Sequence, residues 1–307
     1  MVMHAIESRL KLRHYSLLIA IDEHRSITRV AEMLGVSQPS VTRALTDIES
    51  IFGTLLFTRS RSGLQPTAAG AAVLARARLS LQEHALLAEE LKLVGAGWRG
   101  QLRIGLIPYT PVRLLDAAWA HLLGLQPRVT LLVHEDTTHN LLVAVRKREL
   151  DCAICRFSRE SVDSDLTQEL LLSQPLGLLV GTSAARHLAR RKLDVAVMAR
   201  LDWIFPPPDT PTKEVINAIF AAAGCKVPVP AMQTYSQRTI ASALRRLPDG
   251  ATILPRDIAT EIAASGAGTL LTHELPWTLP PIGLTRLQGA HNAVEIDALV
   301  KALGQVS

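Results

Sequence analysis

The stretch that most constrains the fold is residues 26–49, whose pattern predicts two short helices around a tight turn. Thr28 is positioned to cap the first helix, and Gly35 stands where a helix end favours a left-handed residue. Ser37 can cap the second helix, with Pro39 in its first turn, where a missing N–H is tolerated. The first helix should bury apolar residues spaced three and four apart: Val30, Ala31 and Leu34.

The second helix has an apolar face and a polar face. Four apolar positions at helical spacing predict a buried stripe: Val41, Leu45, Ile48 and Phe52. The opposite face and the N-terminal end carry Gln38, Pro39, Ser40, Thr42, Arg43 and Thr46. No acid precedes Asp47, so this face offers hydrogen-bonding groups to base edges and nothing that repels phosphate. A helix in the DNA major groove needs this pattern, although a helical hairpin with a solvated polar face shares it.

The run from about Leu12 to Leu74 resembles the DNA-binding domain of the LysR-type transcriptional regulators. The resemblance rests on Ser37-Gln38-Pro39-Ser40-Val41-Thr42, Ile48-Glu49, Leu56-Phe57 followed by Arg59, and Thr67 with Gly70. The chain departs from the family at Val30, where the first of two alanines is usual, and at Phe52-Gly53, which replaces Leu-Gly. The resemblance implies a transcriptional regulator that binds promoter DNA through a winged helix-turn-helix, residues 1–67.

Residues 58–66 hold Arg59 and Arg61 without an acid, and Ser62-Gly63 supplies a turn. This composition predicts the wing of the winged helix, with both arginines close to backbone phosphate. Such contacts set affinity and salt dependence rather than sequence choice. A solvated basic loop is the alternative interpretation.

Residues 68–97 are expected to form a linker helix, because proline is absent from 68–94 and alanine and leucine dominate there. Two series of residues recur every seven positions. The first is Leu74, Leu81 and Ala88, and the second, three positions later, is Ala77, His84 and Leu91. This spacing predicts a coiled coil with an imperfect seam at His84, or else a helix packed on its own domain. In the family this helix pairs two subunits, which suits an inverted repeat, and the family usually assembles further into a tetramer.

Beyond residue 98 the pattern alternates between strand and helix, which predicts a parallel sheet with crossover helices. The expected strands cover 101–107, 129–133 and 150–155, and the expected helices 110–123 and 141–148. A last helix should begin with a capping box made by Asn292 and Glu295.

The fold class expected is α/β, with two Rossmann-like subdomains after the winged helix-turn-helix. Subdomain I would comprise residues 98–173 and 270–307, and subdomain II residues 174–269, joined by crossings near 173 and 270. The segment is similar to the effector-binding domain of the same family, including Ile104-Gly105 and the Leu150-Asp151 turn. That domain has the fold of the periplasmic solute-binding proteins.

Two Thr-Pro pairs, at 110–111 and 210–211, each start a predicted helix after an extended segment, one in each subdomain. Helix N-termini at strand ends are where α/β sheets bind ligands, and they favour anions. Alternatively, each threonine only caps its helix. We expect a small carboxylate-bearing effector held by Thr110, Thr137, Thr138, Arg156, Thr210 and Ser236. A neutral sugar would suit the hydroxyls nearly as well, but it would make little use of Arg156 or the helix dipoles.

Other chemistry has little support in the sequence. Cys152 and Cys155 form a CxxC, but residues three apart in a strand face opposite sides, so a redox-sensing regulator is only the alternative. His134 and His139 are five apart, whereas the zinc protease motif needs histidines four apart on a helix. No phosphate-binding loop, dinucleotide motif or nucleophile elbow is present. We therefore expect no enzymatic activity, no cofactor, no catalytic residue and no metal site.

Composition limits the remaining classes. The 307 residues carry a net charge of +5 and three cysteines, a sparse and odd number that is typical of a reducing cytoplasm. Residues 1–13 lack the apolar core of a signal peptide, and no apolar run approaches the roughly 20 residues of a membrane span. A cytoplasmic protein without a membrane partner is expected. A solute-binding protein without DNA function is the rival class, and the helix-turn-helix argues against it.

Overall fold

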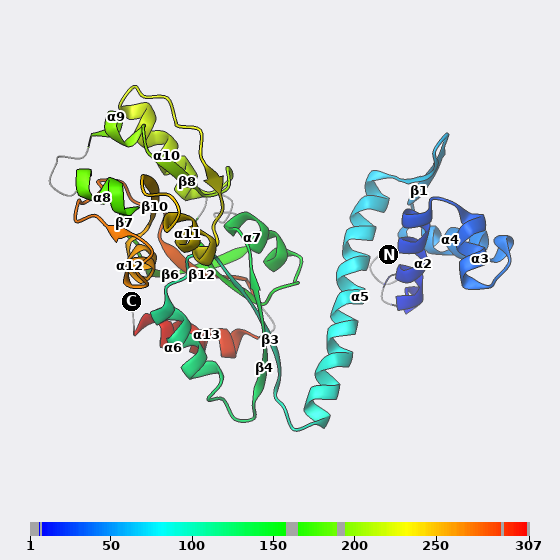
Figure 1. Ribbon diagram of the computed structural model, residues 1–307. Coiled ribbons are helices and arrows are strands. Elements are labelled where there is room, and N and C mark those ends of the chain that lie inside the picture. The colour runs from blue at the N-terminus through cyan, green and yellow to red at the C-terminus, as the bar shows by residue number, and fades with distance from the viewer. Residues whose placement is uncertain (1–5, 7, 158–164, 189–193, 290–291, 306–307) are drawn as a thin grey trace. The chain divides into compact units, whose positions relative to one another are not determined.

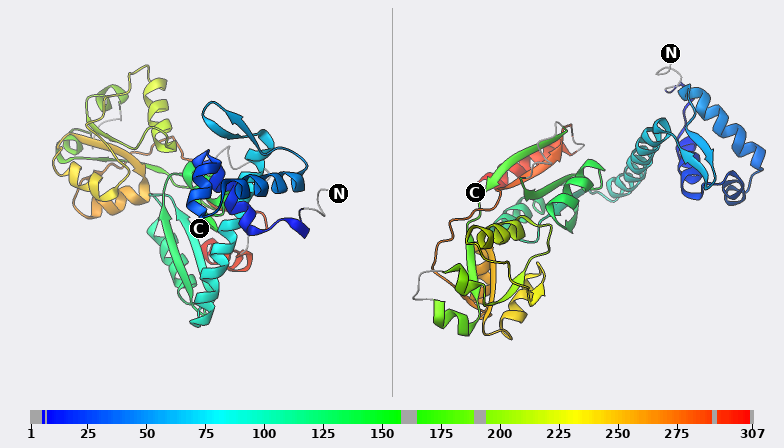
Figure 2. Two further views of the ribbon diagram at one scale, coloured as in Figure 1. Left: turned by 90° about the vertical axis from the view of Figure 1, so that its right-hand side faces the viewer. Right: turned by 90° about the horizontal axis from the view of Figure 1, so that it is seen from above.

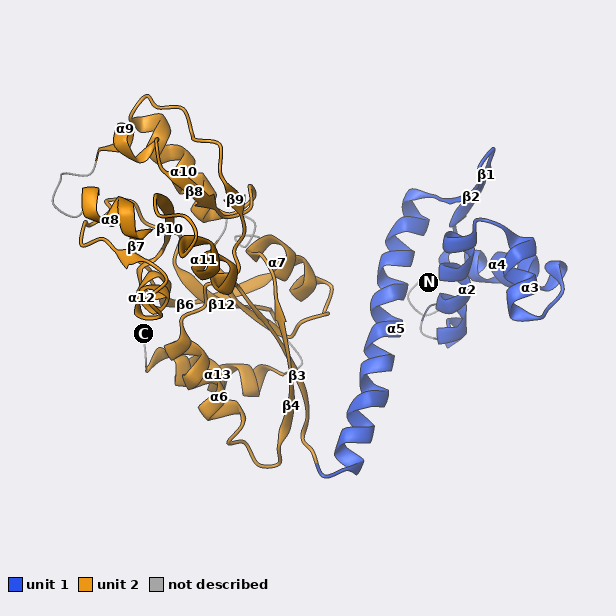
Figure 3. Ribbon diagram, in the orientation of Figure 1, with its two compact units in different colours: residues 1–97 blue, residues 98–307 orange. Residues whose placement is uncertain are grey.

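The structure is a computed structural model that describes residues 6, 8–157, 165–188, 194–289 and 292–305. The chain divides into two compact units, residues 1–97 and 98–307 (Figure 3). The division falls at the residue where the predicted linker helix ends. None of the helices in the described ranges combines the length and the apolar character that crossing a membrane requires.

Within the described residues, the first unit consists of a helical cluster, a hairpin and one long helix (Figure 1). The elements are α2 (Leu12–His24), α3 (Ile27–Leu34), α4 (Gln38–Phe52), β1 (Phe57–Ser60), β2 (Gly63–Pro66) and α5 (Ala68–Gly95). β1 and β2 pair antiparallel and form the predicted wing. The core lies between α2, α3, α4 and the hairpin and includes Leu18, Ile21, Val30, Val41, Ile48 and Leu56.

Helix α3 starts earlier than predicted. Ser26, not Thr28, is its N-cap, and the Ser26 hydroxyl accepts a hydrogen bond from the Arg29 N–H at 3.4 Å. Gly35 ends the helix in the left-handed conformation with φ 64°, which confirms that prediction. Leu34 was expected in the buried stripe, but it is exposed, whereas Val30 and Ala31 are buried and Ile27 packs partly against the core.

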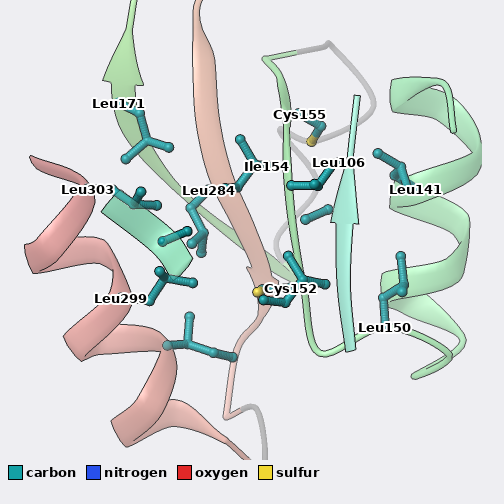
Figure 4. Close-up of a cluster of buried hydrophobic side chains, with 14 of the residues drawn as sticks. Leu106, Leu141, Leu150, Cys152, Ile154, Cys155, Leu171, Leu284, Leu299 and Leu303 are labelled. Atoms are coloured by element: carbon teal, nitrogen blue, oxygen red, sulfur yellow. The ribbon is translucent and has the colours of Figure 1, made fainter. Parts of the chain in front are cut away.

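In the described part of the second unit, the strands form two five-stranded sheets. The first has the order β4-β3-β5-β12-β6, in which β3 pairs parallel with β4 and β5, and β12 pairs antiparallel with β5 and β6. Its elements are β3 (Gly100–Leu106), α6 (Val112–Leu122), β4 (Val129–Glu135), α7 (Thr138–Arg146), β5 (Cys152–Arg156), β6 (Leu166–Leu172), β12 (Ile282–Leu287) and α13 (Ala293–Gly304). Leu299 and Leu303 of α13 pack on one side of the strands and Leu141 of α7 on the other (Figure 4).

The second sheet has the order β11-β7-β10-β8-β9 and shares no strand with the first sheet (Figure 2). Its elements are β7 (Leu176–Val180), α8 (Thr182–Leu188), α9 (Val195–Met198), β8 (Asp202–Phe205), α10 (Pro211–Ala222), β9 (Met232–Gln233), α11 (Gln237–Leu244), β10 (Gly250–Pro255), α12 (Arg256–Ala264) and β11 (Thr269–Leu270). One core cluster includes Trp203 and Phe220, and another includes Ile240 and Ile258.

Two chain crossings join the sheets. The first lies between β6 and β7, near residue 173 as expected. The second lies between Leu279 and Ile282, later than the expected residue 270, because β11 and Leu271 still pack with the second sheet. The two crossing segments run beside each other, since Pro175 and Thr278, the residue before the second crossing, form an antiparallel bridge.

The capping box predicted for the last helix is wrong. Asn292 is the N-cap of α13, but its side chain makes no capping hydrogen bond and donates to the Gln101 carbonyl at 3.5 Å. Glu295 instead forms an ion pair with Arg99 at 2.8 Å. Both residues therefore tie α13 to the first strand of the unit.

Candidate functional site

The polar face of α4 is fully exposed. Gln38, Pro39, Ser40, Thr42, Arg43 and Thr46 are all exposed, while Val41, Leu45, Ile48 and Ile51 are buried on the other side. Ile51 takes the place in the buried stripe that we predicted for Phe52, which is only half-buried.

The hydroxyls on this face are partly engaged within the helix. The Thr42 hydroxyl donates to the Gln38 carbonyl and the Thr46 hydroxyl to the Thr42 carbonyl, both at 3.1 Å. Each threonine oxygen can still accept a hydrogen bond. The face therefore offers acceptors and methyl groups from the threonines, an amide from Gln38, and the charge of Arg43.

Hydrogen bonds of Glu49 and Thr67 join the segment after α4 to α4 itself and to the start of α5. One Glu49 carboxylate oxygen accepts from the Leu56 N–H at 2.7 Å and from the Phe57 N–H at 3.2 Å. The Thr67 hydroxyl donates to the Leu55 carbonyl at 2.9 Å and accepts from the Gly70 N–H at 3.0 Å. A Cβ at Gly70 would lie 2.0 Å from the Leu56 carbonyl oxygen, so only glycine allows α5 to start there.

The hairpin presents both predicted arginines to solvent. Arg59 lies in β1 opposite Leu64, and Arg61 lies in the turn. The Ser60 hydroxyl donates to the Gly63 carbonyl at 2.8 Å and closes that turn. Among the described residues neither guanidinium has a hydrogen-bond or ion-pair partner, so both are available to phosphate.

The second unit contains a cavity of about 780 Å³. Residues of the first sheet and its loops form one wall: Ile107, Pro108, Tyr109, Thr137, Thr138, His139, Arg156, Phe157, Gln168 and Pro280. Residues around the start of α10 and after β9 form the other: Pro206, Asp209, Thr210, Pro211, Thr212, Glu214 and Tyr235. A concave space of this size between two sheets suits a small organic molecule.

Two helices start at the cavity, one from each wall. Thr137 caps α7 by accepting from the Asn140 N–H at 3.5 Å, and Thr210 caps α10 by accepting from the Lys213 N–H at 3.4 Å. Thr138 is the first residue of α7, and its oxygen accepts from the Arg156 N–H at 3.3 Å. The N-terminal ends of both helices therefore add positive potential to the cavity.

Arg156 is the buried charge of the cavity, with 4 % of its surface exposed. Its guanidinium donates to the Pro280 carbonyl at 2.9 Å and to the Gln174 side-chain oxygen at 2.6 Å. The Gln174 amide in turn donates to the Tyr109 carbonyl at 3.2 Å and to the Asp257 carboxylate at 2.8 Å. Burial lowers the pKa of Arg156 to about 10, so the guanidinium stays charged at neutral pH.

This network joins the two halves of the unit. Arg156 ends β5, Gln174 and Pro280 lie on the two crossings, and Asp257 lies in the first turn of α12. The ring of Tyr109 comes from the loop after β3 but packs in the core cluster of α11 and α12. Burial raises the pKa of the Tyr109 hydroxyl, which has no hydrogen-bond partner in the described part of the chain.

Comparison with known proteins decides the family. Residues 12–71 match the family described as "Bacterial regulatory helix-turn-helix protein, lysR family", and residues 95–307 match "LysR substrate binding domain". The chain belongs to the LysR family. It is a ligand-responsive transcriptional regulator with a helix-turn-helix and an effector-binding domain, as the sequence resemblance implied.

Relatives cover nearly the whole chain of this LysR-family regulator. The HTH-type transcriptional regulator GalR of Pseudomonas putida is 28% identical over 96% of this chain and 73% of its own length. GbpR of Azospirillum brasilense is 28% identical over 91% of this chain and 81% of its own. Full-length CbnR in complex with its target DNA superposes with a TM-score of 0.61 at 18% identity, covering 97% of this chain and all (100%) of CbnR. These matches confirm the predicted fold class, and the rival solute-binding protein without DNA function is not supported.

Two of the six predicted effector residues do not line the cavity of this LysR protein. The Thr110 hydroxyl is buried and donates to the Ile107 carbonyl at 2.8 Å, and Pro111 rather than Thr110 caps α6. Ser236 caps α11 by accepting from the Thr239 N–H at 3.3 Å. Their neighbours Tyr109 and Tyr235 face the cavity in their place.

Several cavity residues of the regulator were not among the predicted effector residues. Asp209 and Glu214 flank Thr210 and line the cavity, and acids beside a predicted helix start are a sequence signal against an anion at that end. His139 lines the cavity, whereas His134 lies on β4 with its Nε2 3.6 Å from an Asp136 oxygen. Gln168 lines the cavity from β6, and Phe157 lines it from the residue directly after β5.

The redox alternative is not favoured for this family member. Cys152 and Cys155 are both buried, unpaired and in β5, three residues apart (Figure 4). The Cys155 thiol lies 3.4 Å from the Thr285 hydroxyl, and burial raises its pKa to about 11. Burial also raises the pKa of Cys152, so neither thiol is poised for oxidation.

Proposed function

We propose that this LysR-family regulator reads an operator with Gln38, Pro39, Ser40, Thr42, Arg43 and Thr46, and that Arg59 and Arg61 bind backbone phosphate. The exposed, acid-free start of α4 supports the assignment. The hydrogen bonds of Glu49 and Thr67 hold α4 and the wing in one rigid piece, as a base-reading surface requires. The function requires binding alone and no catalytic step.

For the effector, we propose a small molecule with a carboxylate on the wall of α7. Thr137, Thr138 and Arg156 supply hydroxyls and positive charge on this wall, and Thr210 faces them from α10. Asp209 and Glu214 lie on the α10 wall and would repel a second anionic group. The effector that fits both walls carries its carboxylate toward Arg156 and its hydrogen-bond donors, such as hydroxyls, toward Asp209 and Glu214.

The observation that carries the proposal is the position of Arg156. A charge that is almost fully buried normally has an anionic partner, but among the described residues the Arg156 guanidinium is hydrogen-bonded only to two neutral oxygens. The nearby Asp257 carboxylate favours the charged form of Arg156 but is linked to it only through Gln174. A ligand carboxylate on this wall would supply a direct anionic partner. Arg156 also hydrogen-bonds to a residue on each crossing. A bound anion would therefore change the contacts that hold the two sheets in their present arrangement.

A thermal-shift screen tests the proposal. Hydroxy acids should raise the melting temperature of the full chain, whereas their amides and neutral sugars should raise it much less. In Thr138→Val the stabilisation should shrink, because a cavity hydroxyl is lost. Thr110→Val is the matched control, since Thr110 lies in the neighbouring loop but outside the cavity, and it should respond like the wild type. An equal shift by acids and amides would contradict the anionic assignment.

A further inference from the structure

Arg25 has a backbone conformation that arginine seldom adopts. It ends α2 with φ 53° and ψ 16°, in the left-handed region. A Cβ makes this region unfavourable, so helices that end this way usually do so with glycine. Among the described residues other than glycine, Arg148 with φ 57° is the only other one with positive φ. Strain of this kind often marks a residue whose side chain has a function.

The backbone around Arg25 explains the conformation but not the choice of residue. The Arg25 N–H donates to the Ile21 carbonyl at 2.8 Å, and its carbonyl accepts from the Leu64 N–H of the wing at 2.9 Å. A Cβ at Gly63 would lie 2.4 Å from the Arg25 oxygen, so the wing packs directly on this backbone. Glycine at position 25 would make the same two hydrogen bonds without strain.

The side chain of Arg25 has no structural task that would explain the strain. It is exposed, and its guanidinium has no partner in the described part of the chain. Glu23, two residues earlier, forms no ion pair with it, and Asp22 is already paired with Arg78 at 2.6 Å. The charge is therefore free beside the wing turn and directly before α3.

We propose that Arg25 is a phosphate-binding residue of the DNA interface, retained at a strained position for its charge. In a helix-turn-helix the first helix crosses the DNA backbone while the second enters the groove, so the start of α3 lies next to phosphate. A guanidinium can bind a phosphate through two parallel hydrogen bonds. The proposal rests on the DNA-binding function of the first unit and adds Arg25 to the wing residues Arg59 and Arg61.

The test is Arg25→Gly in the full chain, with binding measured at several salt concentrations. The probes are a duplex from upstream of the protein's own gene and a scrambled duplex of equal length and composition. The variant should melt at a higher temperature because strain is relieved, yet bind both duplexes more weakly. The slope of log affinity against log salt should become less steep by about 0.9 for each Arg25 bound to a phosphate.

Two variants make the result specific. Arg25→Lys keeps the charge and should keep the wild-type salt slope. Arg148→Gly removes the other left-handed arginine, in the second unit, and should leave the slope unchanged. The proposal is overturned if Arg25→Gly keeps the wild-type slope, if Arg25→Lys loses it, or if Arg148→Gly lowers it equally. Failure of the wild type to bind either duplex would instead contradict DNA binding itself.

Discussion

At the scale of single residues, two exposed arginines of the first unit should act differently on DNA. Arg43 lies on the polar face of α4, where a guanidinium can pair with both acceptors of a guanine. Arg59 lies in β1 of the wing, where its natural partner is the phosphate backbone. The same side chain should therefore contribute specificity at one position and general affinity at the other.

Substitution by alanine should separate the two roles. Arg43→Ala should weaken binding to the operator by about 1–3 kcal/mol and relax base preference at one position. Arg59→Ala should weaken binding to all sequences alike and make the salt slope less steep by about one unit. Binding isotherms on operator and scrambled duplexes at several salt concentrations measure both effects. Identical profiles for the two variants would refute the distinction.

At the scale of elements, helix α5 changes its environment along its length. Leu74 and Ala77 of the predicted seam are buried against the first unit itself, so this part fits the alternative of a helix packed on its own domain. Farther along, Leu87, Leu91 and Val94 are exposed, with 62 % of Leu91 accessible. Exposed leucines at helical spacing favour a partner helix, and a second copy of α5 fits the pairing that the family resemblance implies.

We expect the double substitution Leu87→Asp and Leu91→Asp to weaken self-association, because charges would enter the proposed helix–helix contact. Sedimentation should show a shift toward monomer, and operator binding should weaken because two half-sites are no longer held by one dimer. Ala85→Asp alone is the control for position, since it adds one negative charge at an exposed residue on another side of α5. A double variant that sediments like the wild type would exclude this part of α5 from the interface.

At the scale of the whole effector-binding unit, Gln174 links the cavity to both crossings. It accepts from Arg156 at 2.6 Å and donates to Asp257 at 2.8 Å, and it is almost completely buried. Arg156 belongs to the first sheet and Asp257 to a helix on the second. A neutral amide between a buried arginine and a half-buried carboxylate therefore connects the two halves of the unit.

Removal of this amide should loosen the connection. Gln174→Ala removes one hydrogen-bond partner from buried Arg156 and one from half-buried Asp257, which should lower the free energy of unfolding by about 1–3 kcal/mol. Hydrogen exchange in the crossing segments 173–175 and 279–281 should become faster. Thr260→Ala is the control on the same helix as Asp257, because the exposed Thr260 hydroxyl donates to the Arg256 carbonyl of its own helix at 2.7 Å. The free energy of unfolding of this variant should change by no more than about 0.5 kcal/mol. Unchanged exchange in Gln174→Ala would show that the crossings do not depend on this residue.

The sequence alone determined the features that depend on neighbouring residues. Periodicity placed α4 and its buried stripe, Gly35 marked the end of α3, and alternation of strands and helices predicted the two α/β halves. These signals work because helix and strand geometry repeat over a few residues. They left boundaries uncertain by a residue or two, as Ser26 in place of Thr28 shows.

Only the tertiary structure decided which side chains meet. Thr110 and Tyr109 are adjacent in sequence, but one hydroxyl turns back to its own loop while the other residue lines the cavity. Gln174 meets Asp257, and Arg25 meets Leu64, through contacts between residues distant in the chain. Side chains one position apart in the chain point to different faces, and packing against distant segments decides which face lies at the cavity. Local patterns therefore placed Thr137, Thr138, Arg156 and Thr210 at the cavity, but they could not predict its two tyrosines or the strained arginine beside the wing.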